Sequence, residues 1–157
     1  MFQLLSGLSR LRRSVQEQAG AAPVRGSLAL RHVDAGSCNG CEHELAALGN
    51  PYYDLQQYGL SIVASPRHAD LLLVTGTITT PMVEPLRRAY EAMPEPRLVA
   101  AVGNCPLGIA LLGDPRLHAG PLEKLLPVDL RITGCPPSPA QIAAALTDFL
   151  AAHRDDR

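Results

Sequence analysis

The sequence predicts an α/β fold in which helices flank a parallel sheet. From residue 26 onward, strand-like segments alternate with helix-like segments, as they do in proteins with parallel sheets. Residues 71–74 form an unbroken apolar run between Asp70 and Gly76, which is typical of a strand covered on both faces. A chain of 157 residues is long enough for one domain with its own core. We therefore expect a single α/β domain over residues 25–152.

Short apolar runs predict four strands. They comprise residues 27–33, 71–74, 98–102 and 129–132. Residues 103–127, between the last two strands, are rich in Gly and Pro. That stretch is long for a connection, so we expect it to be functional or packed against another part of the molecule.

Helices are predicted between and after these strands. Residues 42–48 and 52–58 are typical of short helices. Thr80 is expected to cap the next helix, with Pro81 at its first position, where the missing N–H costs nothing. The last helix begins at a capping box, Ser138-Pro139-Ala140-Gln141, and an apolar face follows it.

The two ends of the chain are expected to lie outside this domain. Residues 1–24 predict an amphipathic docking helix, because apolar side chains recur at helical spacing with arginines between them. Three interpretations stay open for it: docking on a partner subunit, lying on an anionic membrane surface, or an ordinary solvated helix. Residues 153–157 are a polar tail.

Composition limits the classes of function. The formal net charge is −1, so the chain has no general basic surface for nucleic acid. Only 18% of the residues are charged, which indicates either a surface buried by a partner or a coding bias towards alanine and arginine. No membrane-spanning run or secretory signal is evident, so we expect a reducing cytoplasm, where cysteines more often bind metals than form disulfides.

The cysteines follow the predicted strands. Cys38 and Cys41 come after the first strand, Cys105 after residues 98–102, and Cys135 after the last strand. In an open parallel sheet these strand ends share one edge, where such folds bind their ligands. The sequence therefore predicts that the four thiols converge.

The surroundings of the thiols point to an inorganic ligand. Glycines stand beside them, which lets the backbone approach a bulky group, and Cys105 and Cys135 are each followed by proline. One Cys-x-x-Cys pair joined to two distant single cysteines favours a 4Fe–4S cluster over tetrahedral zinc. Zinc, thiol–disulfide catalysis and unrelated buried cysteines remain alternatives.

These motifs also resemble a known family. Cys-x-x-Cys-Glu, then Gly-x-Cys, then Pro-Val-Asp-x-x-x-x-Gly-Cys-Pro-Pro at residues 127–137 are similar to the small subunit of membrane-bound, energy-converting nickel–iron hydrogenases, including the formate hydrogenlyase type. They also resemble the homologous B (20 kDa) subunit of respiratory NADH:quinone oxidoreductase. The resemblance covers residues 26–150. It implies a flavodoxin-like domain that holds one 4Fe–4S cluster on Cys38, Cys41, Cys105 and Cys135, proximal to the active site of a large partner subunit.

Details of the motifs favour the hydrogenase branch. The quinone-reducing branch has two adjacent cysteines at the first position, whereas here Asn39 and Gly40 separate Cys38 from Cys41. Uptake hydrogenases add an export signal and further cysteines, and neither is seen here. The chain departs from the family after Cys105, where a glycine-rich stretch is replaced by Pro-Leu-Gly-Ile-Ala.

The resemblance implies an electron-transfer subunit without substrate chemistry of its own. Its partners would be a hydrogenase-type large subunit, a ferredoxin-like or polyferredoxin subunit, and membrane subunits reached through the N-terminal region, on the cytoplasmic side of the membrane. A B-type subunit that passes electrons to quinone is the first alternative, and a zinc-stabilised interaction module is the second.

Several side chains near the cysteines have two competing interpretations. Glu42 is a candidate for proton transfer, but it is also a favourable charge in the first turn of a helix. His43 is expected to be solvated or hydrogen-bonded rather than a ligand. Thr75-Gly76-Thr77 follows a strand at the same edge and either donates hydrogen bonds to the cluster or forms an ordinary turn. No partner is predicted for His32.

Overall fold

The computed structural model describes residues 26–153. The predicted N-terminal helix over residues 1–24 therefore lies outside the described residues, and so does the tail beyond His153. Within residues 26–153, no helix is both long and apolar enough to span a bilayer.

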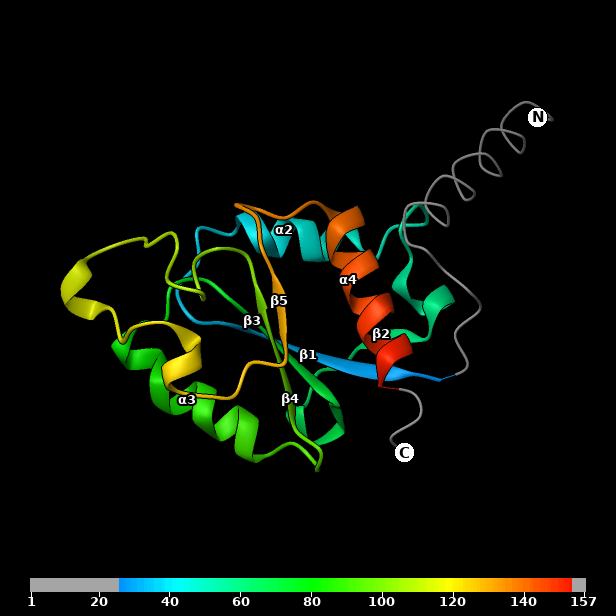
Figure 1. Cartoon of the computed structure of the whole chain (residues 1–157), viewed down its shortest axis with the longest axis horizontal. Coiled ribbons are helices and arrows are strands. Elements are labelled where there is room, and N and C mark those ends of the chain that lie inside the picture. Colours follow the sequence, from blue (N-terminus) through cyan, green and yellow to red (C-terminus); the bar gives the residue numbers. More distant parts are fainter. Residues whose placement is uncertain (1–25, 154–157) are drawn as a thin grey trace.

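Five parallel strands form the centre of the molecule (Figure 1). They are β1 (Leu28–Asp34), β2 (Leu60–Ile62), β3 (Leu71–Thr75), β4 (Leu98–Val102) and β5 (Leu130–Ile132). Their order across the sheet is β2-β1-β3-β4-β5. This is the flavodoxin-like order of doubly wound sheets, so the predicted fold class is confirmed.

One strand was not predicted. The sequence favoured a helix over residues 52–58, whereas only Leu55–Tyr58 form a short 3-10 helix, η1, and β2 follows it at once. Strand β2 has three residues, and only Leu60 is buried in it. A half-exposed edge strand of this length has no periodicity that distinguishes it from a loop.

Each face of the sheet has its own core. Leu71 and Leu73 of β3 belong to the cluster of buried side chains on one face, and Leu72 and Val74 to the cluster on the other. All four are fully buried, as the unbroken apolar run predicted. Helices α2 (Gly40–Ala47) and α4 (Pro139–Ala152) cover the first face, and α3 (Thr80–Glu91) covers the second (Figure 1).

The start of α4 was predicted correctly, whereas the start of α3 was predicted one residue too late. Helix α4 begins at the expected capping box, in which Ser138 and Gln141 each bind the backbone N–H of the other. Helix α3 begins one residue early, because Thr79 occupies the N-cap position and makes no side-chain cap bond. Thr80 is no cap: its hydroxyl donates instead to the carbonyl oxygen of Leu117, at 3.0 Å.

The long connection between β4 and β5 is ordered by two 3-10 helices, η3 (Pro115–Leu117) and η4 (Leu122–Lys124). Leu122 is fully buried in the α3-side core. The connection is therefore packed against the domain, as its length predicted.

Candidate functional site

The four cysteines meet in one cavity at the carboxyl edge of the sheet. Residues from the loops after β1, β4 and β5 line it together with Gly76, which follows β3: Ser37, Cys38, Gly40, Cys41, Gly76, Asn104, Cys105, Gly134, Cys135 and Pro136. All four thiols are free. Cys105 is buried, Cys41 is half-buried, and Cys38 and Cys135 are exposed. The predicted convergence is confirmed, and the cavity opens on the Cys38 and Cys135 side.

The first pair of thiols is held by a tightly bonded loop. Asp34 Oδ1 accepts from the N–H groups of Gly36 and Ser37, both at 2.8 Å, where β1 ends. The Ser37 hydroxyl accepts from the N–H of Asn39 at 3.1 Å. Asn39 takes a left-handed conformation, with φ of 65°, and α2 starts directly after it. Cys41 thus lies in the first turn of α2 while Cys38 precedes it.

The other two thiols are joined through Asn104. Its N–H donates to the carbonyl oxygen of Gly134, and its Oδ1 accepts from the N–H of Gly134, each at 2.9 Å. The Gly103 N–H donates to the carbonyl oxygen of Ile132 at 2.7 Å. These bonds fix the loop of Cys105 to the loop of Cys135.

Two glycines allow the loops to pack this closely. A Cβ on Gly76 would lie 2.6 Å from backbone atoms of Gly36 and Ser37. A Cβ on Gly103, where φ is +91°, would lie 2.6 Å from Cys41 Sγ. Side chains at either position would push the thiol-bearing loops apart.

The site disfavours the free thiolates of Cys41 and Cys105. Burial raises the pKa of Cys41 to about 12, and the charges of Glu42 and the other three cysteines add to the rise. Burial also raises the pKa of Cys105, with Cys135 and Cys38 adding to it and a hydrogen bond from Thr77 opposing it. Burial and neighbouring negative charge thus disfavour the thiolates of Cys41 and Cys105, and a cationic group bound beside them would stabilise those thiolates.

The donor set fits an iron–sulfur cluster. Within residues 26–153, no group of three or more His, Cys, Asp or Glu side chains is placed to hold a single metal ion. The thiols instead surround a cavity, from three loops, with glycines where a bulky ligand approaches.

Glu42 lies in a small polar network beside the site. Its Oε1 accepts a hydrogen bond from the Thr75 hydroxyl, and His32 Nε2 lies 2.8 Å from Thr75 Oγ1 and 3.6 Å from Glu42 Oε1. Glu42 Oε2 is buried and has no hydrogen-bond partner in the described part of the chain. Burial lowers the pKa of His32, while the charges of Glu42 and Asp34 raise it and that of Arg31 lowers it. His43, by contrast, is exposed, as expected.

Sequence reasoning missed the roles of two polar residues of this region, His32 and Asn104. His32 contacts Thr75 across the β1–β3 pair, and this contact depends on strand register, which no motif reports. The sequence predicted no role for Asn104, which separates Gly103 from Cys105. Its position before a cysteine at a strand end was the signal that could have identified it.

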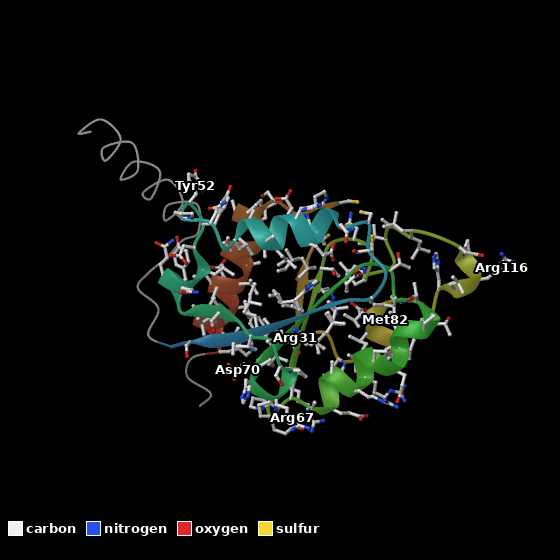
Figure 2. The ribbon with its side chains drawn as sticks, turned by 180° about the vertical axis from the view of Figure 1, so that it is seen from behind. Arg31, Tyr52, Arg67, Asp70, Met82 and Arg116 are labelled. Carbon is white, nitrogen blue, oxygen red and sulfur yellow. The ribbon has the colours of Figure 1, made fainter. Side chains whose placement is uncertain are left out.

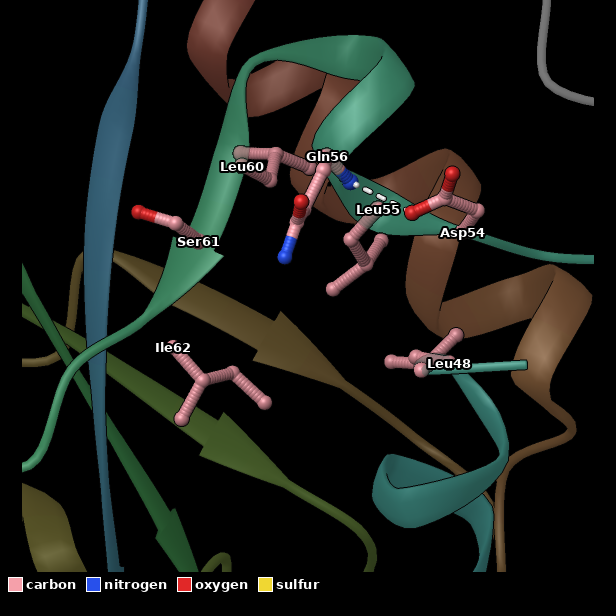
Figure 3. A pocket seen from close by; sticks show the side chains of 8 residues that line it. Leu48, Asp54, Leu55, Gln56, Leu60, Ser61 and Ile62 are labelled. Atoms are coloured by element: carbon pink, nitrogen blue, oxygen red, sulfur yellow. Dashed lines mark hydrogen bonds between the residues drawn. The ribbon is translucent and has the colours of Figure 1, made fainter. Parts of the chain in front are cut away.

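A second pocket, of about 170 Å³, lies between η1, β2 and the end of α2 (Figure 3). It is lined by Leu48, Gly49, Asp54, Leu55, Gln56, Leu60, Ser61 and Ile62. Its acidic side chain, Asp54, already accepts from the Gln56 N–H at 3.3 Å. No cysteine or histidine lines it, so the cysteine cavity is the stronger candidate.

Comparisons with known proteins show the family of this chain. The family model described as NADH ubiquinone oxidoreductase, 20 Kd subunit, matches residues 38–149, a range that includes all four cysteines. A probable membrane-bound hydrogenase subunit of Pyrococcus furiosus is 44% identical over 111 residues, which cover 71% of this chain and 66% of that protein. Formate hydrogenlyase subunit 7 of Escherichia coli is 40% identical over 117 residues, covering 74% of this chain and 46% of that protein.

A solved structure is also similar. A chain of the membrane-bound sulfane sulfur reductase, an archaeal respiratory membrane complex, matches with a TM-score of 0.67 and 32% identity, covering 80% of this chain and 71% of that chain. The alignments span just under two thirds of the Pyrococcus protein and under half of the Escherichia protein.

Proposed function

Since this chain belongs to the family of the 20 kDa subunit of NADH:ubiquinone oxidoreductase, we propose that it is the electron-transfer small subunit of a membrane-associated nickel–iron hydrogenase complex. The hydrogenase relatives and the separation of Cys38 from Cys41 by two residues support this branch. The chain would carry out no catalysis alone.

The observation that carries the proposal is the convergence of Cys38, Cys41, Cys105 and Cys135 on one cavity. These four residues would hold a single 4Fe–4S cluster. Such a cluster supplies one-electron transfer, and the protein sets its potential through ligation, burial and hydrogen bonds to sulfur.

The exposed side of the cavity supports the proposal of a partner protein at this edge. Cys38 and Cys135 are exposed, so a second protein has to cover that edge to shield a cluster from water. We assign this place to a hydrogenase-type large subunit, with the cluster proximal to its active site. A ferredoxin-like or polyferredoxin subunit would supply electrons, and residues 1–24 would reach the membrane subunits on the cytoplasmic side.

The ligand set is tested by spectroscopy on the complex purified without oxygen. Wild type should contain about four iron atoms and four acid-labile sulfides for this site and give the electron paramagnetic resonance signal of a reduced 4Fe–4S cluster. Cys105→Ser should abolish the normal signal, whereas Ser61→Ala, on the exposed part of β2 and outside the cysteine cavity, should keep it. An unchanged signal in Cys105→Ser would remove Cys105 from the ligand set.

The zinc alternative has its own test in the same preparation. One zinc ion per chain with no acid-labile sulfide would refute the electron-transfer proposal, because zinc has no redox chemistry.

A second candidate function is supported by the family model, whose description names a ubiquinone oxidoreductase. A B-type subunit would pass the same electrons to quinone. Hydrogen evolution and quinone reduction, assayed side by side on the purified complex, separate the two. Activity with quinone alone would replace the hydrogenase assignment.

Glu42 is proposed to assist proton movement at the interface. Its carboxylate adjoins Cys41 in sequence, is mostly buried, and keeps one oxygen without a partner among the described residues. Glu42→Gln should slow turnover while leaving the cluster signal unchanged. Full activity in that variant would reduce Glu42 to a favourable charge in the first turn of α2.

A further inference from the structure

The first turn of α2, which carries Cys41, is weakly held by contacts within the helix itself. Within the described residues, its N-cap Asn39 makes no side-chain cap bond, and the helix begins with Gly40, a poor helix former. Among residues 40–47, Leu45 alone is buried. The turn therefore depends on contacts with the sheet.

Two strands present polar side chains to this turn. His32 comes two positions after Leu30 in β1, and Thr75 two positions after Leu73 in β3, so each pair shares a face of the sheet. Both leucines belong to the core on the face covered by α2 and α4. In Figure 2, α2 lies above β1 in the view, and α3, marked by Met82, lies below it. His32 and Thr75 thus continue two apolar rows to the carboxyl edge of the sheet, on the side of α2.

These two side chains reach Glu42, the residue after Cys41, through a chain of hydrogen bonds. The Thr75 hydroxyl donates to Glu42 Oε1, and His32 Nε2 lies 2.8 Å from Thr75 Oγ1. A threonine hydroxyl has one proton, and here it is given to Glu42, so the oxygen accepts from His32, whose Nε2 carries the hydrogen. Thr75 is fully buried, so water is kept from its hydroxyl.

We infer that His32 and Thr75 are positioning residues of the cysteine site: their hydrogen bonds join the Glu42 carboxylate to β1 and β3 and so hold the Cys41-bearing turn of α2 on the sheet. The inference rests on the proposed function, in which Cys41 is a cluster ligand. It adds two side chains that hold no iron and act only through Glu42. It needs the carboxylate only as an acceptor, whatever part Glu42 takes in proton movement.

Loss of the Thr75 hydroxyl would release this turn. Glu42 Oε1 would be left without its donor, and Oε2 already has no hydrogen-bond partner among the described residues. An unpaired carboxylate in a mostly buried place is costly, so Glu42 would turn towards water and draw the first turn of α2 with it. A ligand that is no longer held by its supporting hydrogen bonds binds its metal group less tightly. Iron should then be lost more easily from the site of Cys41.

Thr75→Val tests the inference, since it keeps the shape of the side chain and removes the hydroxyl. The measurement is the rate at which the anaerobic complex loses this cluster to an iron chelator, monitored through the electron paramagnetic resonance signal of the reduced cluster. We expect the loss to be about tenfold faster than in wild type, because a hydrogen bond to a charged group is removed. Thr75→Ser, which keeps the hydroxyl, should restore the wild-type rate.

His32 tests the other end of the hydrogen-bond chain. His32→Leu removes the donor to Thr75 but leaves the bond from Thr75 to Glu42, so its effect should be smaller than that of Thr75→Val. His32→Gln keeps an N–H for the same hydroxyl and should be close to wild type. Because both variants leave the buried Thr75 in place, they decide the matter even where Thr75→Val does not fold. Equal rates of cluster loss in His32→Leu and His32→Gln would overturn the role of His32.

Thr147→Val is the matched control. Thr147 is also buried, and its hydroxyl donates to the carbonyl oxygen of Ala143 at 2.7 Å within α4, outside the cysteine cavity. The same substitution of a buried threonine should here leave the rate of cluster loss unchanged. Equal acceleration in Thr147→Val and Thr75→Val would overturn the inference, because the loss of a buried hydroxyl, rather than of the link to Glu42, would then explain it.

The outcomes separate the inference from the function on which it rests. A wild-type complex without a cluster signal would refute the proposed function. A normal wild-type signal, with the same rate of cluster loss in wild type and Thr75→Val, would refute only the role of Thr75. Equally fast loss in Thr75→Val and Thr75→Ser would also refute it, since the methyl group rather than the hydroxyl would then be required.

Discussion

Asn104 and Gly134 exchange two hydrogen bonds, one through the backbone of Asn104 and one through its side chain, each 2.9 Å long. Asn104 directly precedes Cys105, and Gly134 directly precedes Cys135. Two thiols that lie thirty positions apart in sequence are thereby fixed relative to each other, before any ligand is considered.

Asn104→Ala should weaken this link without removing it. The side-chain acceptor is lost and the partly buried Gly134 N–H is left without it, which costs about 1 kcal/mol of folding free energy. The backbone bond from Asn104 remains. We expect a lower melting temperature and less iron bound per chain, measured on anaerobically purified protein.

Asn50→Ala is the control for this change. Asn50 Oδ1 also accepts from backbone N–H groups, those of Tyr52 and Tyr53, but it lines no part of the cysteine cavity. It should lower stability by a similar amount and leave the iron content unchanged. Equal iron loss in both variants would mean that stability, not the link between the loops, limits cluster binding.

Gly103→Ala should disrupt the cysteine site through a steric clash with Cys41. The new Cβ would lie 2.6 Å from Cys41 Sγ, and the backbone φ of +91° adds about 1–2 kcal/mol of strain for a residue with a side chain. Cys41 has to move, so iron and sulfide content should fall strongly. The measurement is iron and sulfide per chain, with circular dichroism to check that the fold is kept.

Gly113→Ala separates backbone strain from the steric clash. Gly113 has a φ of +80°, but a Cβ there meets nothing within 4 Å. This variant has the same kind of backbone strain without the contact, so its cluster content should match that of wild type. Similar losses in the two variants would contradict the steric explanation.

The sequence predicted the sheet, its parallel sense and the convergence of the thiols, because these depend on long apolar runs and on the edge rule for parallel strands. Strands β3 and β4 are five residues each and buried on both faces, which gives a strong signal. Strand β2 was not predicted, because it is short and half-exposed. The start of α3 was misplaced because Thr79 and Thr80 are chemically alike, and only the tertiary contact of Thr80 with Leu117 distinguishes them.

The polar contacts around the site could be predicted only in part. The cysteines, Glu42 and the Thr75–Thr77 turn were recognisable from their places after strands. The partners of those side chains were not, since the contacts of His32 with Thr75 and of Thr77 with Leu112 join residues 43 and 35 positions apart. Such contacts are set by strand register and loop packing.

Ser138→Ala should destabilise the domain without affecting the cysteine site. It removes the half of the capping box in which the Ser138 hydroxyl accepts from the Gln141 N–H, while the backbone N–H of residue 138 can still donate to Gln141 Oε1; loss of such a cap typically costs about 0.5–2 kcal/mol. The apolar face of α4 packs in the same core as β5, so unfolding of the whole domain should shift to lower denaturant concentration. Ser61→Ala, on the exposed part of β2, should leave the midpoint where it is.

Protonation of His32 is expected to destabilise the folded domain at acidic pH. Burial lowers the pKa of His32 in the folded state below its ordinary value of 6.5, with Glu42 and Asp34 opposing the effect and Arg31 adding to it. The unfolded chain therefore binds a proton more readily than the folded chain as the pH falls through about 6.5. The stabilising contribution is present above that pH and is lost below it, down through the folded-state pKa. The melting temperature of wild type should fall between about pH 7.5 and about pH 5.5, and fall less in His32→Gln. His68→Gln, which replaces an exposed histidine, should keep the wild-type slope. A slope unchanged by His32→Gln would show that protonation of His32 does not limit stability in this range.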